Sequence, residues 1–193
     1  MSVEPKLLEL IEKCKTGDRR AQFDLYGMFS GLMFAVSLRY TNSRIDAEDV
    51  VQNAWVKIFS KLDTFSENNS FEGWMRRIVV NTAITLYRKN KKHANQADIS
   101  EVLATPAEID ASKECDFTRE ELEKAISRMP EGYGIVFKLY VIDGYKHKEI
   151  AEMLEIEVNT SKSQLSRAKK FLQGVLSHME QIAKPSVDNP KEH

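Results

Sequence analysis

The chain has 193 residues, 42% of them hydrophobic, which is enough for one domain or two small ones with real cores. Its two cysteines, Cys14 and Cys115, lack the spacing of a zinc site or a disulfide framework, and no apolar run suits a signal peptide or a membrane span. A soluble protein of the reducing cytoplasm is therefore expected, with no direct membrane insertion.

The formal net charge is only −1, but the basic residues gather in two blocks. Residues 73–97 contain six basic residues and no acidic one, and residues 158–179 contain four and no acid. Between them, residues 98–123 carry nine acids against two basic residues, a balance of −7. This alternation indicates two polyanion-binding surfaces joined by an acidic connector.

Helical periodicity runs through the chain, and no alternating strand is found, so the expected fold is all-α. Residues 1–92 are expected to form a first small domain. It would contain a short helix at 7–13, a helix capped by Asp18, a helix capped by Asp46 and a helix that begins at Ser70.

A polar stretch and a second helical domain follow. Residues 93–117 lack an apolar stripe, which is typical of a flexible linker. The second domain, 118–180, opens with a capping box from Thr118 to Glu121. Its further helices are expected at residues 135–142, 148–154 and 159–178. Residues 181–193 are expected to be a disordered tail.

Two helices joined by a short turn, the second rich in cations, predict a helix-turn-helix that places a helix in the major groove. At the helical repeat, one side of the last helix is expected to be buried, made of Ser161, Leu165, Ala168, Leu172 and Val175. The residues predicted to contact DNA are Asn159, Thr160, Lys162, Ser163, Ser166, Arg167 and Lys170. Short polar side chains can reach base edges, whereas cations hold phosphates. The alternative is an ordinary amphipathic helix with a solvated basic face, but the absence of acids favours DNA.

The helix that begins at Ser70 carries the other basic surface, on a face that also includes Ile84. The residues predicted to contact DNA here are Trp74, Arg76, Arg77, Asn81, Arg88 and Lys89. A tryptophan among cations suits unpaired bases, because the ring stacks on a base while the cations follow the backbone. In the alternative, Trp74 belongs to the core and packs under the preceding loop.

Three carboxylates, Asp46, Glu48 and Asp49, lie close together near the start of the preceding helix. They could suggest a metal site, but acids also favour a helix N-terminus, and no nearby histidine completes a ligand set. Capping combined with an acidic protein-docking face is the better interpretation. We therefore expect no metal, no cofactor and no catalytic residue.

These segments together resemble a known family. Residues 46–55, DAEDVVQNAW, resemble the core-polymerase-binding segment of bacterial sigma-70-type factors, specifically the extracytoplasmic-function (ECF) group. Residues 71–89 resemble the group's −10 promoter segment. The stretches similar to its −35-reading domain are residues 129–131, 144–154 and 159–169.

The resemblance implies a sigma factor that binds core RNA polymerase and directs promoter-specific initiation. Domain 1–92 would be the region-2 domain, which captures the melted −10 strand, and domain 118–180 would be the region-4 domain, which reads the −35 duplex. The residues implied to face the clamp helices of core polymerase are Asp46, Asp49, Gln52 and Asn53. The acidic linker would thread into the polymerase channel. An anti-sigma factor is a common partner in the family.

Two positions depart from the family pattern. Glu155 stands in the helix-turn-helix turn where glycine is usual, and a left-handed conformation there would cost about 1 kcal/mol. Thr85 stands in the −10 helix where the family often has Asp.

Two other classes of protein are alternatives to a sigma factor. A free-standing helix-turn-helix regulator would need a sensor or dimerisation domain where this chain has a second basic surface. A nuclease using Asp46, Glu48 and Asp49 would need a general base, and the four histidines are remote from these acids in the sequence.

Overall fold

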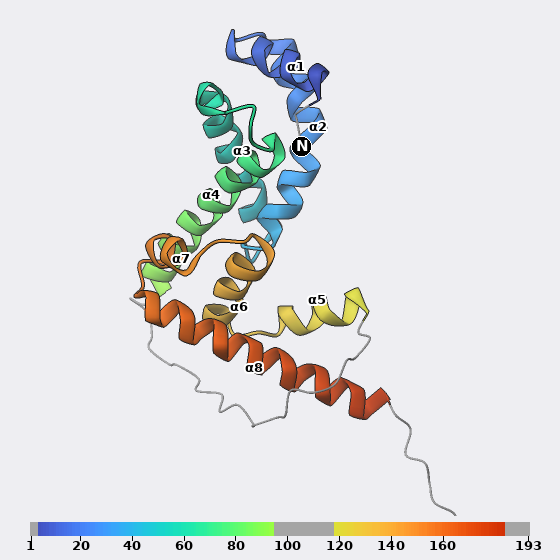
Figure 1. Cartoon of the computed structure of the whole chain (residues 1–193), viewed down its shortest axis with the longest axis vertical. Helices are drawn as coiled ribbons and strands as arrows, with labels where there is room; N and C mark the ends of the chain where they lie inside the picture. Colours follow the sequence, from blue (N-terminus) through green and yellow to red (C-terminus); the bar gives the residue numbers. More distant parts are fainter. Residues whose placement is uncertain (1–3, 95–117, 184–193) are drawn as a thin grey trace, which may run out of the picture. The chain divides into compact units, whose positions relative to one another are not determined.

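The computed structural model describes residues 4–94 and 118–183 (Figure 1). These residues are helical and contain no strand, and the chain divides into unit 1, Met1–Ile99, and unit 2, Ser100–His193. The expected all-α class with two helical regions is thus confirmed. The predicted flexible linker and disordered tail lie largely outside the described residues, and the predicted domain boundaries stay predictions.

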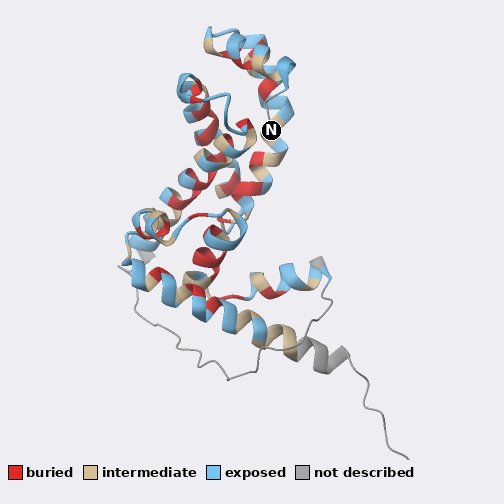
Figure 2. Cartoon of the chain, in the orientation of Figure 1, coloured by how far each residue is buried: buried red, intermediate tan, exposed pale blue. Residues whose placement is uncertain are grey.

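Within residues 4–94, unit 1 has three long helices and two short elements. They are α1 (Pro5–Lys15), α2 (Arg19–Leu38), α3 (Arg44–Ser60), the 3-10 turn η1 (Leu62–Thr64) and α4 (Phe71–Ala94). α2, α3 and α4 pack on one another, and α1 closes against α2 and η1. The buried residues line the sides on which these helices meet (Figure 2). Fully buried side chains from the three long helices include Leu25, Met33, Val36, Ala47, Ala54, Ile58, Met75, Val79, Val80 and Ala83.

The N-terminal caps of unit 1 show how local sequence starts each helix. Asp18 caps α2 as predicted, because its carboxylate accepts hydrogen bonds from the N–H groups of Arg20 and Ala21 at 2.8 and 3.2 Å. The prediction that Asp46 caps α3 is wrong. Ser43 is the cap: its hydroxyl accepts from the Asp46 N–H at 3.0 Å, so α3 begins earlier and Asp46 lies in its first turn. Ser70 starts α4 as predicted, with its hydroxyl accepting from the Gly73 N–H at 3.2 Å.

The described part of unit 2, residues 118–183, forms four helices and one π-helical turn. They are α5 (Arg119–Ser127), α6 (Glu131–Phe137), the π-helical turn η2 (Lys138–Ile142), α7 (His147–Leu154) and α8 (Val158–Ala183). The predicted capping box at the start of α5 is present: the Glu121 N–H donates to Thr118 Oγ1 and the Thr118 N–H donates to Glu121 Oε2. α5, α6 and α7 all pack against α8, which is therefore the central element of this unit.

The helix expected at 135–142 is longer and less regular than predicted. It begins at Glu131, directly after Pro130, and its last five residues form η2. There the Asp143 N–H donates to the Lys138 carbonyl at 3.1 Å, an i to i−5 bond. Gly144, with φ +73°, then turns the chain toward α7.

Two helices extend beyond their predicted ends. α4 runs to Ala94, two residues into the predicted linker 93–117, and α8 runs to Ala183, three residues into the predicted tail 181–193. Both extensions consist of residues that a helix tolerates, and the first strong helix breaker after α8 is Pro185. None of the helices in the described parts of the chain is long and apolar enough to cross a membrane.

Candidate nucleic-acid interface

α7 and α8 form the predicted helix-turn-helix, and the turn between them has one strained residue. Glu155 has φ +55° and ψ +47°, the left-handed conformation that the glycine of related turns would adopt without strain. The residue after Glu155 is bonded back to α7: the Ile156 N–H donates to the Ala151 carbonyl at 3.0 Å. α8 begins two residues later, at Val158.

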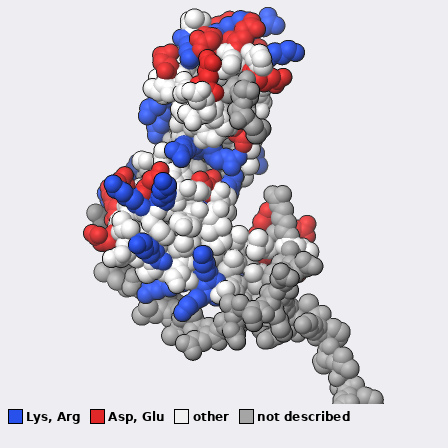
Figure 3. All heavy atoms as spheres, viewed as in Figure 1, with Lys and Arg blue, Asp and Glu red and all other residues white. Residues whose placement is uncertain are grey.

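The faces of α8 agree with the sequence prediction in its N-terminal half. Ser161, Leu165 and Ala168 are buried as predicted. Leu172 and Val175, also expected on the buried side, are only half-buried, and so is Thr160. The other predicted DNA contacts on this helix are exposed: Asn159, Lys162, Ser163, Ser166, Arg167 and Lys170. Figure 3 shows Lys and Arg side chains gathered over this part of unit 2. The surface can therefore meet a duplex with hydrogen-bonding groups and cations together.

A histidine joins α8 to the rest of the helix-turn-helix. His147 is the first residue of α7, and its Nδ1 lies 2.9 Å from Oγ of Ser161, which is 0% exposed. Its ring stacks on Tyr140 of η2, with centroids 4.6 Å apart and planes 25° apart. Burial, followed by the charges of Lys162 and Lys169, lowers the pKa of His147. The sequence prediction missed this residue, because its partner lies fourteen positions away on another helix.

The basic face of α4 in unit 1 is narrower than predicted. Arg77, Asn81 and Lys89 are exposed, whereas Arg76 and Arg88 are half-buried. Ile84, expected on this face, is 2% exposed, so that expectation is wrong. The reason is tertiary: α4 packs against both α2 and α3, and the buried arc is wider than one apolar stripe.

Trp74 lies between its two predicted environments. It is half-buried and belongs to an aromatic cluster, stacking on Phe71 at 5.6 Å and contacting Phe65, in the preceding loop, at 5.7 Å. The next residues, 66–70, are exposed. Trp74 is thus held in place by the loop, and part of its ring stays accessible.

Charge pairing also reduces the basic character of this face. Nη2 of Arg76 lies 2.6 Å from Oε1 of Glu72, one turn earlier on α4. Glu72 lies just outside the acid-free block of residues 73–97, so a count over that block overstates the free charge.

The structure adds Lys57 of α3 to the basic surface of α4. Its ammonium donates to the Thr82 hydroxyl at 3.1 Å, and that hydroxyl donates in turn to the Ile78 carbonyl at 2.7 Å. An ammonium has three donors, so one bond to Thr82 leaves others for an anion. No local sequence pattern joins residues 57 and 82, but the helical repeat does place Lys57 on the exposed side of α3.

The predicted polymerase-binding residues of α3 occupy one side of that helix. Asp49, Gln52 and Asn53 are exposed, and the Asn53 amide donates to the Asp49 carbonyl at 2.8 Å. Asp46 is half-buried, and its carboxylate accepts from the Ser43 hydroxyl at 2.8 Å. Among the described residues, no group of three or more His, Cys, Asp or Glu side chains is placed to hold a metal ion. Asp46 thus acts on the start of α3, and Asp49 lies on its exposed side.

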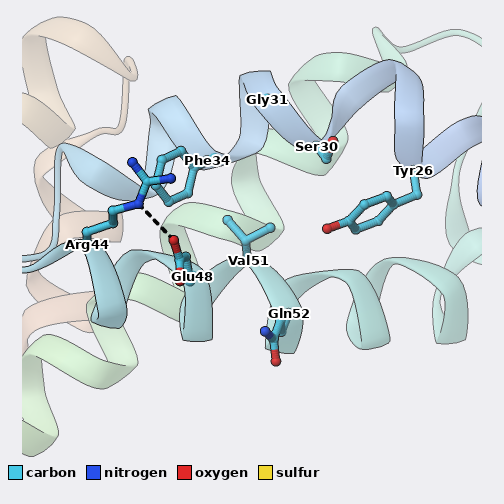
Figure 4. A pocket seen from close by; sticks show the side chains of 8 residues that line it. All are labelled: Tyr26, Ser30, Gly31, Phe34, Arg44, Glu48, Val51 and Gln52. Carbon is cyan, nitrogen blue, oxygen red and sulfur yellow. Dashed lines mark hydrogen bonds and ion pairs between the residues drawn. The ribbon is translucent and has the colours of Figure 1, made fainter.

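A groove of about 400 Å³ runs between α2 and α3 beside these residues (Figure 4). Its walls are Tyr26, Ser30, Gly31 and Phe34 of α2 and Arg44, Glu48, Val51 and Gln52 of α3. At one end the Arg44 guanidinium lies over the Phe34 ring at 5.3 Å and pairs with Glu48 at 2.9 Å. Beyond the groove, Phe23, Ile45 and Val56 are more than two-thirds exposed, at 75%, 72% and 71%. This mixture of apolar and polar groups suits a protein partner.

The fold and these surfaces define an all-helical DNA-binding protein with a helix-turn-helix in one unit, and a basic helix and a groove of mixed polarity in the other. Residues 25–93 match the model of Sigma-70 region 2, and residues 119–172 match that of Sigma-70, region 4. The chain belongs to the sigma-70 family, in its ECF group, and is a sigma factor that directs transcription initiation. A free-standing regulator is not favoured.

Relatives match over most of their length. The chain is 27% identical to the ECF RNA polymerase sigma factor SigW of Bacillus subtilis, over 88% of this chain and 96% of that protein. It is 26% identical to the ECF RNA polymerase sigma-E factor of Escherichia coli, over 84% of this chain and 90% of that protein. The sigma factor RpoE of Bartonella quintana, solved in complex with the anti-sigma factor NepR, superposes with a TM-score of 0.48 at 21% identity, covering 86% and 97% of the two chains.

Proposed function

We propose that the two units divide promoter recognition between them. α4 of unit 1 holds the melted −10 strand through Trp74, Arg76, Arg77, Asn81, Arg88 and Lys89, and α8 of unit 2 reads the −35 duplex through the residues named above. The exposed side of α3, with Asp46, Asp49, Gln52 and Asn53, docks on core RNA polymerase. The chain itself catalyses no reaction and works in the cytoplasm, where it meets the polymerase.

The observation that carries this proposal is that α3 presents both sets of groups. Asp49, Gln52 and Asn53 are exposed on it, and Lys57, one turn after Asn53, bonds Thr82 of α4. One helix therefore links a protein-docking face to a nucleic-acid face within a single packed unit. A polymerase bound to α3 would hold α4 at a fixed place beside the DNA.

Transcription reconstituted with purified components tests the proposal directly. The full chain is mixed with core RNA polymerase and fragmented genomic DNA, and the 5′ ends of run-off transcripts are sequenced. We expect transcription start sites that share one upstream pair of sequence elements. These start sites should vanish when the chain is left out. Equal promoter-specific binding with and without core polymerase would contradict it.

Two variants separate the surfaces. Asp49→Ala should weaken core-polymerase binding and leave the fold intact, because the Asn53 amide bonds the backbone carbonyl of residue 49 and not its side chain. Asp63→Ala, an exposed acid in η1, is its matched control. Arg167→Ala should reduce initiation that depends on the −35 element while polymerase binding stays normal, with the exposed Lys124→Ala in α5 as control.

An anti-sigma factor is the remaining proposed partner. The groove between α2 and α3 adjoins Gln52, so a protein that filled it would also cover the proposed polymerase face. Co-expression of the chain with a candidate anti-sigma protein should block core-polymerase binding. Simultaneous binding of both proteins would show that this face is not shared.

A further inference from the structure

We propose that His147 is a positioning residue for the recognition helix, and that it takes up a proton when α8 binds duplex DNA. The inference rests on the proposed role of α8 in reading the −35 element. It is carried by the His147–Ser161 hydrogen bond, by the stack on Tyr140 and by the location of both at the junction of η2, α7 and α8.

Ser161 is the reason that the hydrogen bond matters. It is the only serine of the described N-terminal half of α8 that is fully buried, and it lies between Thr160 and Lys162, two proposed DNA contacts. A buried hydroxyl without a partner is costly, so the bond to His147 favours one rotation of α8 about its axis. That rotation decides which side chains of α8 face the DNA.

Protonation of His147 does not break this link. In the neutral ring the Ser161 hydroxyl can donate to Nδ1, and in the charged ring the Nδ1–H donates to the Ser161 oxygen. The stack on Tyr140 suits both forms, because a cationic ring is attracted to an aromatic face. His147 can therefore change its charge while α8 keeps its place.

The charges around His147 give the direction of the coupling. Lys162 and Lys169 of α8 face the His147 ring, and Tyr140 of η2 stacks on it. In the sequence, His147 is flanked by Lys146 and Lys148. The carboxylate of Glu149 accepts a hydrogen bond from the Lys146 N–H at 2.7 Å. These neighbours are mostly cationic and disfavour a further positive charge. DNA phosphates that pair with Lys162 and Lys169 would remove that repulsion, so the pKa of His147 should rise on binding. By linkage, binding should then be tighter at lower pH.

The test uses the full chain in complex with core RNA polymerase and a duplex of a promoter recovered by the run-off experiment. Affinity is measured between about pH 8 and about pH 6, where histidine titrates. The wild type should bind more tightly as the pH falls, by up to about tenfold for each unit by which DNA raises the pKa.

Three variants distinguish positioning from charge. At about pH 8, His147→Ala and Ser161→Ala should each weaken binding about five- to tenfold, and the double variant should be no worse than either alone. At lower pH the loss in His147→Ala should grow, because that variant cannot take up the proton. His147→Asn should bind like the wild type at about pH 8, because its amide can replace Nδ1, but should lose the pH dependence. Ser127→Ala in α5, whose hydroxyl bonds only within its own helix at 2.8 Å, is the matched control.

The outcomes separate this inference from the proposed function. Additive effects of His147→Ala and Ser161→Ala, or the same pH dependence in His147→Asn as in the wild type, would overturn the inference while leaving promoter recognition intact. Failure of the wild-type holoenzyme to select any promoter would instead overturn the proposed function. Far-UV circular dichroism of each variant shows whether α8 is still folded.

Discussion

The strained turn of the helix-turn-helix makes a quantitative prediction. Glu155 has a left-handed backbone, φ +55° and ψ +47°, which costs a residue with a Cβ about 1–2 kcal/mol. Glycine removes that strain but gains backbone freedom in the unfolded chain, at a cost of about 0.5–1 kcal/mol. Glu155→Gly should therefore stabilise unit 2 by about 0.5–1 kcal/mol relative to Glu155→Ala, a shift of about 4 °C in Tm. Because both variants lose the carboxylate, the comparison isolates the backbone.

The two tryptophans make the assay specific. Trp55 and Trp74 both lie in unit 1, so tryptophan fluorescence follows only that unit, whereas far-UV circular dichroism follows both. The expected result is a shift of the dichroism transition between Glu155→Gly and Glu155→Ala, with no change in the fluorescence transition. Equal dichroism midpoints for the two variants would refute a left-handed turn at residue 155.

Three further predictions concern unit 1. Asp18→Ala should destabilise it by about 1 kcal/mol, because two backbone N–H groups of α2 lose their acceptor. A urea titration followed by tryptophan fluorescence measures the change, and an unaltered urea midpoint would contradict the cap. Lys57→Gln should make the affinity for single-stranded DNA less dependent on salt, with a change in the slope of log K against log [salt] that corresponds to about one lost phosphate contact. The control Lys13→Gln in α1 should keep the wild-type slope. Equal slopes for the wild type and Lys57→Gln would exclude Lys57 from the interface. Burial raises the pKa of the Cys14 thiol to about 11. In a Cys115→Ser variant, a thiol reagent at about pH 8 should therefore label Cys14 only after denaturation. Rapid labelling of the folded chain would disprove the burial of Cys14.

The features that could be predicted from the sequence are those set by neighbouring residues. Asp18 and Thr118 cap their helices through side chains that bond backbone groups two or three positions away. The buried side of α8 follows from the helical repeat, because α8 packs mainly through one face. Even the strain at Glu155 was foreseeable, since the position of the turn is fixed by the helices on either side.

The features that could not be predicted depend on tertiary packing. Ile84 is buried because α4 lies against two helices, and a single apolar stripe does not reveal the second contact. Lys57 and Thr82 meet across α3 and α4, twenty-five residues apart, and His147 meets Ser161 across the helix-turn-helix. These pairs of residues lie outside the range of any helical or capping pattern.

The helix α3 has a practical consequence for genetic studies of this protein. Its buried side packs through Ala47 and Ala54, both 0% exposed, and its Lys57 bonds α4. A bulky substitution at either alanine would displace α3 from the helices it packs on, α2 and α4, and so disturb two functions with one change. Mutants selected for poor polymerase binding would then include many that have lost −10 recognition for the same reason. Only changes confined to the outward side chains, such as Asp49, would yield a pure docking phenotype.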